Sequence, residues 1–430
     1  MTDFDVIVSG GGMVGSLLAA ALGKAQLRVL VLEANLPASF EAQSDYDLRV
    51  SALSIASERM LKVLGAWEGI MARRAAPFMR MKVWDGEQGG TTLFDAADQA
   101  KAKSDSEEDE SSAPQHLGTI VENRVLQLAL HDVLKQLQSV ELRAPASLKS
   151  FDTRVDYIAV ELEDNSVVTA SLLVGADGAR SQVRELAGIG IQQSRYPQEA
   201  LVATVATELP QQDITWQRFL PSGPQALLPL DGQRASMVWY HSQEEVQRLK
   251  ALTDDEFLDA MHSAFPAETG KLTGISGRGS FPLFRSHAER YVAERIALIG
   301  DAAHTVHPLA GQGVNLGLLD AAVLAEVVLN AAGIGTASPT KRDFGKLRTL
   351  RAYQRWRRTE NTLMINILDG FYQAFRPRTQ SFQKLRSALM DGAGRIKPLR
   401  RLIMQHATGV SGDLPLLARG QSLPGYPAND

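Results

Sequence analysis

Short apolar runs and glycine turns alternate at the start of the 430-residue chain. Residues 5–9 form an apolar run typical of a buried strand, and the glycines of residues 10–15 interrupt it. Residues 13–25 are rich in Ala and Leu and predict a helix, and residues 26–33 predict a second strand. The pattern therefore predicts a unit of strand, helix and strand.

A second group of strands is predicted in the middle of the chain. Residues 156–177 alternate between apolar and polar positions and end in a glycine turn. Residues 200–241 contain several strand-like runs, with an Asp-Gly turn at 231–232 that favours antiparallel pairing. Residues 295–304 predict another buried strand that leads into a glycine-rich turn.

The C-terminal part is predicted to be helical and basic. Helical patterns extend from Gly317 to the end, with breaks near residues 333–340 and at Pro377. The net charge of the whole chain is −4. Residues 341–430 carry 17 Lys and Arg against 6 Asp and Glu, and the remaining 340 residues carry 28 against 43. A basic region on an acidic protein suits an anionic membrane face. No nucleic-acid recognition motif accompanies it, so we expect no nucleic-acid partner.

The composition is that of an ordinary globular protein. Hydrophobic residues make up 44% and the chain has 0 Cys, which excludes disulfides and thiolate metal sites. The acidic N-terminus predicts no signal peptide, and no apolar stretch approaches the length of a membrane span. We therefore expect a cytoplasmic protein, with the inner face of the membrane as a peripheral contact. Residues 101–112, KAKSDSEEDESS, predict a mobile acidic surface loop.

A first glycine motif indicates a nucleotide. Gly10, Gly12 and Gly15 match GxGxxG between a predicted strand and a predicted helix. Such glycines permit a tight turn, close approach of a pyrophosphate and close packing of the helix. Glu33 ends the second strand, where an acid can accept a hydrogen bond from a ribose hydroxyl. The motif predicts nucleotide binding but does not separate NAD from FAD.

A second motif, GDAAHTVHPLAGQGVNLG at residues 300–317, admits two interpretations. Asp301, His304 and His307 stand at three-residue spacing, as metal ligands on a helix would. Pro308 and the glycines disfavour a helix there, and a metal requires about three or four ligands. A flavin explains more, because glycines let backbone N–H groups approach a flat ring. A helix beginning near Val314 would place its positive end against the charge of a reduced flavin. We expect no metal, and expect both histidines to serve the packing of the turn.

Three fingerprints in order identify a family. The chain resembles the class A flavoprotein monooxygenases through GxGxxG, through GADGARSQVR at residues 175–184 with its Asp177, and through the motif at 300–317. LRVSALSIASERMLKVLGAWE at 48–68 and LGTIVENRVLQLAL at 117–130 resemble the ubiquinone-biosynthesis ring hydroxylases. Within that group, ITWQRFLPSGPQALLPL is most similar to the demethoxy-ubiquinol hydroxylases.

The resemblance implies an α/β fold similar to that of p-hydroxybenzoate hydroxylase. A Rossmann-like FAD-binding domain would comprise residues 1–78, 117–190 and 288–340. An antiparallel-sheet substrate domain would comprise residues 79–116 and 191–287, and residues 341–430 would form a helical C-terminal region.

The resemblance also assigns the cofactor residues. It implies that Glu33 binds the FAD ribose, and that Arg49 and Arg124 reach the phosphate and ribityl region. Asp301 would bind the ribityl chain, and Asp177 would serve both FAD and the nicotinamide donor. The flavin pyrimidine edge would be bound by the backbone of Gly311, Gly313, Val314 and Asn315.

The implied reaction is hydroxylation of a prenylated phenol or quinol. NAD(P)H, a transient co-substrate, would reduce bound FAD, and O2 would form a C4a-hydroperoxide that transfers oxygen to the ring. No residue is identified as the base; Tyr240 and His241 lie on a strand where packing is the common role. The alternatives are a flavin-dependent prenyl-lipid reductase or epoxidase, and a non-catalytic prenyl escort.

One predicted helix carries an apolar stripe that admits two interpretations. Either the helix packs this stripe on its own domain or on a sister subunit, or the stripe contacts a membrane or a biosynthetic partner. The stripe repeats every four residues, with Leu363, Ile367, Phe371 and Phe375 beside Arg355, Arg357 and Arg358.

Overall fold

The computed structural model describes most of the chain, and the predicted acidic loop at 101–112 lies outside the described residues. The described residues are 2–87, 89–98, 116–210, 212–265, 269–308, 311–334, 342–376, 383–384, 386–388, 392, 404 and 408–427.

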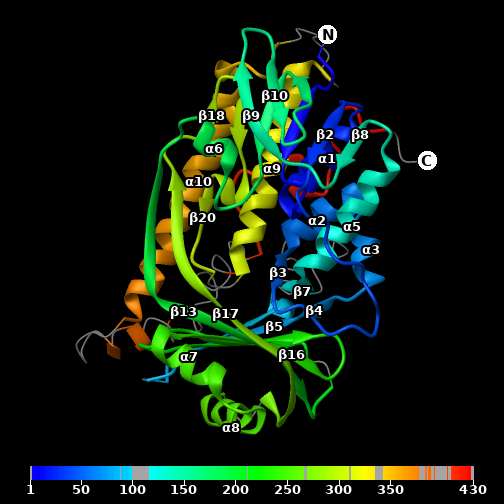
Figure 1. Cartoon of the computed structure of the whole chain (residues 1–430). Coiled ribbons are helices and arrows are strands. Elements are labelled where there is room, and N and C mark those ends of the chain that lie inside the picture. The colour runs from blue at the N-terminus through cyan, green and yellow to red at the C-terminus, as the bar shows by residue number, and fades with distance from the viewer. Residues whose placement is uncertain are drawn as a thin grey trace.

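A mostly parallel sheet lies at the centre of the upper half of the molecule in Figure 1. β1 runs parallel to β12 on one side and to β2 on the other, as the predicted unit of strand, helix and strand requires. The order is β18 (Val292–Ala293), β19 (Ile296–Leu298), β12 (Leu172–Gly175), β1 (Val6–Ser9), β2 (Val29–Leu32) and β8 (Val140–Arg143), and only β18 is antiparallel to its neighbour.

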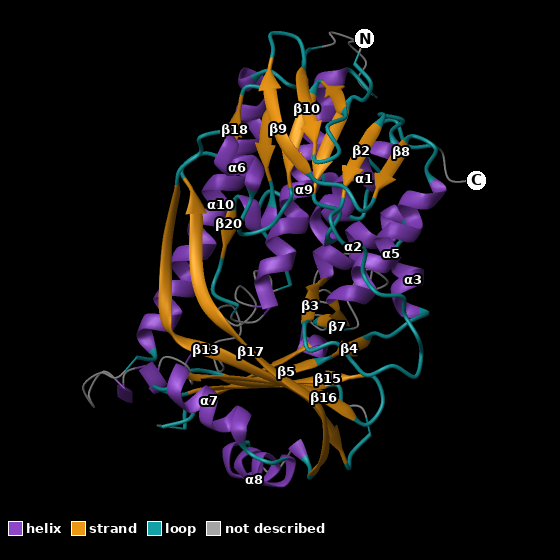
Figure 2. Cartoon of the chain, in the orientation of Figure 1, coloured by secondary structure: helices purple, strands orange, loops and turns teal. Residues whose placement is uncertain are grey.

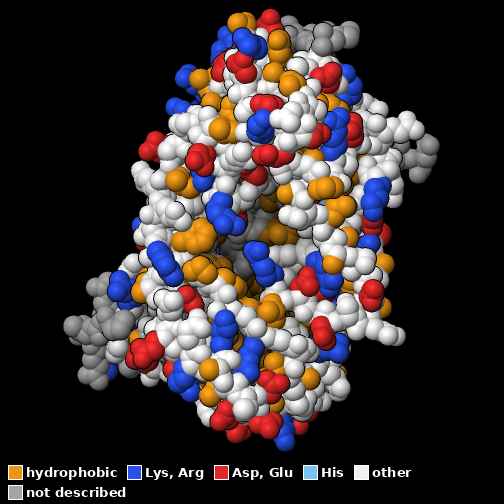
Figure 3. Space-filling view, in the orientation of Figure 1, with side chains coloured by type: hydrophobic (Ala, Val, Ile, Leu, Met, Phe, Trp, Pro, Cys, Tyr) orange, Lys and Arg blue, Asp and Glu red, His pale blue; other side chains and the backbone are white. Residues whose placement is uncertain are grey.

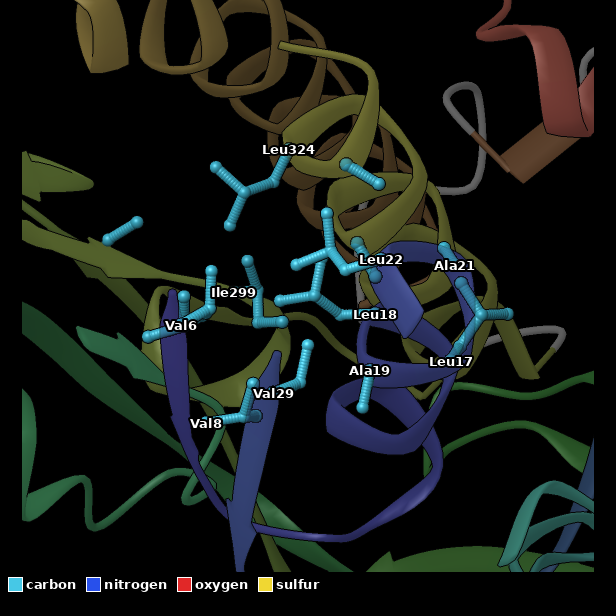
Figure 4. Packing of buried hydrophobic residues seen from close by; sticks show 14 of the residues in the cluster. Val6, Val8, Leu17, Leu18, Ala19, Ala21, Leu22, Val29, Ile299 and Leu324 are labelled. Carbon is cyan, nitrogen blue, oxygen red and sulfur yellow. The ribbon is translucent and has the colours of Figure 1, made fainter. Parts of the chain in front are cut away.

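Three helices pack together on this sheet: α1 (Met13–Lys24), α5 (Asn123–Gln136) and α9 (Gln312–Ala332). Figure 4 shows Leu18 and Leu22 of α1 between strand residues such as Val6 and Leu324 of α9. Burying one such leucine contributes roughly 1.5–3 kcal/mol. The expectation that no apolar stretch approaches a membrane span was wrong, because residues Gly313–Ala332 are long and apolar enough by composition. In this fold 72% of that helical window is buried, as in a core helix.

An eight-stranded sheet forms the lower half (Figure 2). The predicted antiparallel sheet is mixed, since β14 and β5 run parallel while the other neighbours are antiparallel. Helices α7 (Gln243–Ala251) and α8 (Asp254–Ala264) cover one face. The order is β20 (His304–Thr305), β17 (Leu272–Ala288), β13 (Ile191–Thr207), β16 (Arg234–Ser242), β15 (Gln225–Leu230), β14 (Ile214–Phe219), β5 (Arg80–Asp85) and β6 (Thr91–Asp95).

The long strands β13 and β17 reach from the lower sheet to the upper domain (Figure 2). The remaining described strands form two antiparallel sheets of three strands each. One contains β3 (Val50–Ser54), β7 (Gly118–Glu122) and β4 (Ala76–Phe78). Along the chain, β3 is followed by α2 (Ile55–Leu64) and α3 (Trp67–Met71). The other contains β9 (Leu148–Thr153), β10 (Ile158–Leu162) and β11 (Val167–Ala170), and α6 (Gln182–Leu186) follows β12.

The C-terminal region is helical only in part. α10 (Leu347–Ala374) packs on α9 and β18, and the Tyr353 hydroxyl donates to the Leu298 carbonyl at 2.7 Å. The prediction of helices to the end was wrong for residues 408–427, where turns and a short 3-10 helix at Leu416–Arg419 replace them. Pro415 and left-handed glycines such as Gly420 prevent a regular helix, and the segment buries Leu417 in the core of the upper domain.

Candidate functional site: a cofactor cradle

The three motifs meet at the carboxyl ends of neighbouring parallel strands. Gly10 follows β1, Ala176 follows β12 and Gly300 follows β19. A Cβ added at Gly10 would lie 2.4 Å from the Ala176 carbonyl oxygen, and one at Gly300 would lie 3.3 Å from Val14. Ligands of open α/β sheets bind outside this edge of the sheet, so the motifs build one site.

The glycines of the first motif have separate environments. A Cβ at Gly15 would lie 2.0 Å from the Gly10 carbonyl oxygen, so this glycine permits close packing of α1. Gly12 caps α1 and has no heavy atom within 4 Å of an added Cβ. Open space at the residue that precedes the first N–H groups of α1 suits a pyrophosphate.

Side chains absent from the motif hold its loop in place. The Gly11 carbonyl accepts from Ser16 Oγ at 2.9 Å, Gln127 Nε2 at 3.0 Å and the His131 ring at 2.7 Å. Sequence reasoning missed Gln127 and His131. Their spacing of four places them on one face of α5 and was the available signal, although spacing alone does not identify the group that they bind.

Glu33 lies directly beside the glycine loop. Its Oε2 accepts from the Gly11 N–H at 2.7 Å, and its Oε1 accepts from the Asn35 N–H at 2.9 Å. Each carboxylate oxygen retains acceptor capacity for a sugar hydroxyl. Glu33 thus directly follows β2 and lies beside the glycine loop, and its role toward a ribose stays a prediction.

Arg124 belongs to a charged cluster at the start of α5. Its guanidinium pairs with Asp47 at 3.2 Å and with Glu122 at 3.8 Å. Burial raises the pKa of Glu122, while the charges of Arg74 and Arg124 oppose that shift. Arg74 also donates to the carbonyls of Ala42 and Ser44, so the cluster fixes the segment that precedes Arg49.

Asp301 and Arg49 form the electrostatic centre of the site. The Asp301 side chain is accessible to solvent, although protein surrounds it closely. Burial raises the pKa of its carboxyl, and the charges of His304 and Arg49 oppose that shift. Arg49 is exposed, and its positive charge is one of those that act on the Asp301 carboxyl.

A buried network supports the turn that carries Asp301. Asp320 of α9 accepts from His304 at 2.5 Å, from the Gly300 N–H at 3.0 Å and from Arg357 Nε at 2.7 Å. Burial alone would raise the pKa of Asp320, but His304 and Arg357 lower it to about 2. His304 therefore packs the turn, as expected. The described residues contain no group of three His, Asp or Glu side chains placed to bind a metal ion.

The N-terminus of α9 faces β3. The helix begins at Gln312 rather than near Val314, because Gly311 adopts a left-handed φ of 63° and caps it. The N–H groups of the first turn, which includes Gly313 and Val314, have no partner within the helix. The buried Asn315 side chain binds Ala52, Gly311, Ser54 and Ser57, so it ties the loop to β3 and α2.

The middle motif ties two of these loops together. Asp177 accepts from the Val183 N–H through Oδ2, while its buried Oδ1 has no hydrogen-bond partner. Arg184 donates to the Ala302 carbonyl at 2.9 Å and to the Ala179 carbonyl at 3.0 Å. Arg184 thus connects the motif at 175–184 to the turn that carries Asp301.

A deep hollow opens between the upper domain and the lower sheet, with Lys and Arg side chains near its rim (Figure 3). The residues present fit FAD. The open cradle at Gly12, the N–H groups of two helix N-termini and the unpaired Oδ1 of Asp177 are the donors and acceptors that a dinucleotide requires. Binding of NAD would not explain the presence of a second glycine loop at Gly311. Tyr240 packs as expected, with its hydroxyl 3.3 Å from the Pro308 carbonyl.

Comparisons with known proteins agree with this geometry. The FAD binding domain family matches residues 3–351. The 3-demethoxyubiquinol 3-hydroxylase of Escherichia coli is 38% identical over 94% of this chain and 98% of that protein. The ubiquinone hydroxylase UbiL of Rhodospirillum rubrum is 37% identical over 97% of this chain and 93% of that protein.

A solved structure supports the fold independently. The p-nitrophenol 4-monooxygenase PnpA from Pseudomonas putida superposes with a TM-score of 0.73 at 20% identity, and the match covers 94% of this chain and 97% of that one. The chain uses FAD as its cofactor and NAD(P)H as co-substrate. It belongs to the FAD-dependent aromatic monooxygenases, within the group of the ubiquinone-biosynthesis ring hydroxylases.

Proposed function

We propose that this enzyme hydroxylates the aromatic ring of a prenylated phenol or quinol in ubiquinone biosynthesis. The observation that carries the proposal is the near full-length similarity to two bacterial hydroxylases whose names specify ubiquinone or its demethoxy precursor. The hollow between the cofactor cradle and the lower sheet offers the place for such a ring.

The protein contributes binding and exclusion of water rather than the oxygen chemistry itself. Bound FAD supplies electron transfer from NAD(P)H and the activation of O2. Arg49 and Asp301 would hold the sugar-alcohol chain of the cofactor, and the first turn of α9 would stabilise negative charge at the flavin pyrimidine edge. The apolar residues around Tyr240, including Phe219 and Leu283, would keep water from the reacting ring.

A lipid extract from cells that lack the gene tests this proposal. Mass spectrometry should find a prenylated ring compound one oxygen short, and the wild-type gene should restore the normal quinone, whereas Asp301→Ala should not. Oxygen uptake coupled to ring hydroxylation by the purified enzyme would separate a hydroxylase from a reductase. A normal quinone profile without the gene, in cells with no second hydroxylase, would contradict the assignment.

We also propose that α10 rests on the anionic cytoplasmic face of the membrane in which a prenylated substrate resides. The opposite face of α10 packs on its own domain through Tyr353, Ile365 and Tyr372. The stripe itself stays accessible, with exposed fractions of 56% for Leu363, 47% for Ile367 and 41% for Phe371. Exposed apolar side chains in a row are typical of contact surfaces.

The predicted stripe requires two corrections. Phe375 is buried and stacks on Phe219 with ring centroids 4.5 Å apart, so the stripe ends at Phe371. Arg357 is buried in the pair with Asp320 and offers no charge to a membrane. Arg355 is exposed and lies eight residues, or two four-residue steps, before Leu363, where it supplies a cation for anionic lipids.

Vesicle flotation tests this contact. Wild-type protein should float with vesicles of mixed anionic and neutral phospholipid, and the double variant Leu363→Ser/Ile367→Ser should not. The matched control is Val155→Ser/Val167→Ser, which removes two exposed apolar side chains elsewhere. Equal flotation of both variants would contradict the proposal, and a loss of dimers instead of flotation would assign the stripe to a sister subunit.

A further inference from the structure

His307 is a buried side chain whose polar atoms have no partner. It is 2% exposed, and neither ring nitrogen makes a hydrogen bond. His304, three residues earlier, is equally buried but is bound by Asp320. Buried polar groups are nearly always paired, and an exception in a native protein indicates a group held for a ligand or a reaction.

Three tyrosines enclose the His307 ring, yet none of them satisfies it. The ring centroids of Tyr196, Tyr372 and Tyr240 lie 4.7, 5.3 and 5.5 Å from that of His307. Their hydroxyl groups point to other acceptors, namely Asp369 at 3.1 Å, Gln198 at 2.6 Å and the Pro308 carbonyl at 3.3 Å. These three tyrosines form a box that holds the imidazole by ring contacts and leaves both of its nitrogens without a hydrogen bond.

The position of His307 relates it to the cofactor. It precedes Gly311, the cap of the helix expected to face the flavin pyrimidine edge, by only four residues. The tyrosines come from β13, β16 and α10, so the upper domain, the lower sheet and the C-terminal helix meet at this ring. A substrate ring bound beside the first turn of α9 would therefore lie near this junction.

Burial, rather than neighbouring charge, keeps the His307 imidazole neutral. Burial lowers its pKa to about 4, and the negative charge of Asp369 opposes that shift. Asp369 pairs with Arg285 at 2.9 Å, and the charge of Arg376 also acts on Tyr372. A neutral imidazole offers one acceptor nitrogen and one donor nitrogen.

We propose that His307 binds the ring hydroxyl of the substrate and accepts its proton, which makes it the base of the hydroxylation. This inference rests on the proposed function. The O–H bond of the substrate breaks, its electron pair stays on oxygen, and the proton forms an N–H bond on the imidazole. The more electron-rich ring attacks activated oxygen more readily. As the ring regains aromaticity it loses its C–H proton to water, and His307 returns its proton to the original oxygen.

The variants His307→Leu and His307→Gln test the proposal in the FAD-loaded enzyme. The probes are a phenol with one isoprene unit and its ring-fluorinated, more acidic analogue. Both variants should keep wild-type FAD content and thermal stability, because no hydrogen bond of the folded chain is lost. Hydroxylation of the plain phenol should fall by about 100-fold or more. The fluorinated phenol should recover much of that loss, because a more acidic hydroxyl needs less help.

The outcomes separate the inference from the proposed function. If the wild-type enzyme hydroxylates neither phenol, nor a prenylated quinol, the proposed function fails and this inference fails with it. If the wild type is active and both variants match it, His307 is not the base. Loss of FAD or of stability in step with activity in both variants would make His307 a packing residue. A defect that is equal for both phenols would likewise overturn the proposal.

Discussion

His304 Nε2 lies 2.5 Å from Asp320 Oδ2, so a side chain of the cofactor turn is anchored to the core helix α9. The other oxygen of Asp320 accepts from Arg357 of α10 at 2.7 Å and from Asn361 at 3.0 Å. One buried carboxylate therefore joins the turn that carries Asp301 to both long helices. The Asp320 carboxylate is thus the counter-charge of the buried Arg357 in apolar surroundings.

Replacement of Asp320 should therefore be costly. Asp320→Asn leaves the buried Arg357 with only the partly exposed Glu360 as its counter-charge, and breaking a buried pair costs up to about 3–5 kcal/mol. Urea unfolding of the purified protein measures this difference. The control is Asp164→Asn, which changes an exposed carboxylate in a turn of the upper domain. Equal unfolding midpoints for the two variants would contradict the network's role.

The Asp320 carboxylate also predicts that the stability of the folded protein depends on pH in the acidic range. The folded pKa of Asp320 is about 2, below the ordinary value of 3.8. Its contribution to stability is thus complete above about pH 4 and is lost as pH falls toward 2. The shift corresponds to roughly 2 kcal/mol. Denaturation measured across this range should be less pH-dependent in Asp320→Asn than in the wild type.

Asp301 and Arg49 provide a test of the cofactor assignment. Asp301→Asn keeps the shape of the side chain but removes the charge that Arg49 acts upon. Hydrogen bonds to charged groups contribute about 1.5–3 kcal/mol, so FAD affinity should fall by about 10- to 100-fold. Quenching of flavin fluorescence on titration with apoprotein measures the dissociation constant. Unchanged affinity would place the ribityl chain elsewhere.

The glycines of the first motif provide a matched pair of variants. Gly15→Ala places a Cβ 2.0 Å from the Gly10 carbonyl oxygen, so α1 must move and the protein should be destabilised. Gly12→Ala meets no atom of the chain within 4 Å and has an ordinary extended backbone, so thermal stability should be unchanged. FAD binding should nevertheless weaken in Gly12→Ala, because the new methyl group occupies the phosphate cradle. Thermal melts with and without FAD distinguish the two effects, and equal behaviour of both variants would contradict the geometry.

The elements that local pattern controls could be predicted from the sequence. The apolar runs of β1 and β2, the glycines between them and the acid at Glu33 are local features, and the structure places them together. The start of α9 was misplaced by two residues because a left-handed Gly311 caps it, and a glycine cluster does not reveal which glycine has that conformation. The segment at 408–427 was predicted as helix from its neighbours although Pro415 and its glycines oppose one.

Contacts between distant segments could not be predicted in this way. The sequence analysis did not single out Asp320, and it placed Arg357 beside a contact stripe. The two residues are 37 positions apart, and nothing in their local sequence indicates that they form a pair. The clamp of Gln127 and His131 on the Gly11 carbonyl spans more than 110 positions. His307 was assigned to packing of the turn, since its tyrosine box is assembled from three segments far from it in sequence.

The unpaired His307 also predicts how stability changes with pH. Its folded pKa is about 4, below the ordinary value of 6.5, so the unfolded chain binds a proton in this range that the folded protein excludes. Stability is therefore unaffected above about pH 6.5 and falls as pH is lowered toward 4, by roughly 3 kcal/mol for this group. His307→Leu removes the group, and should be at least as stable as the wild type at neutral pH and lose less stability on acidification. Chemical denaturation at several pH values between 4 and 7 measures the slope. Leu363→Ser, which changes no titratable group, should retain the slope of the wild type, and the same slope in His307→Leu would show that this imidazole is protonated in the folded protein.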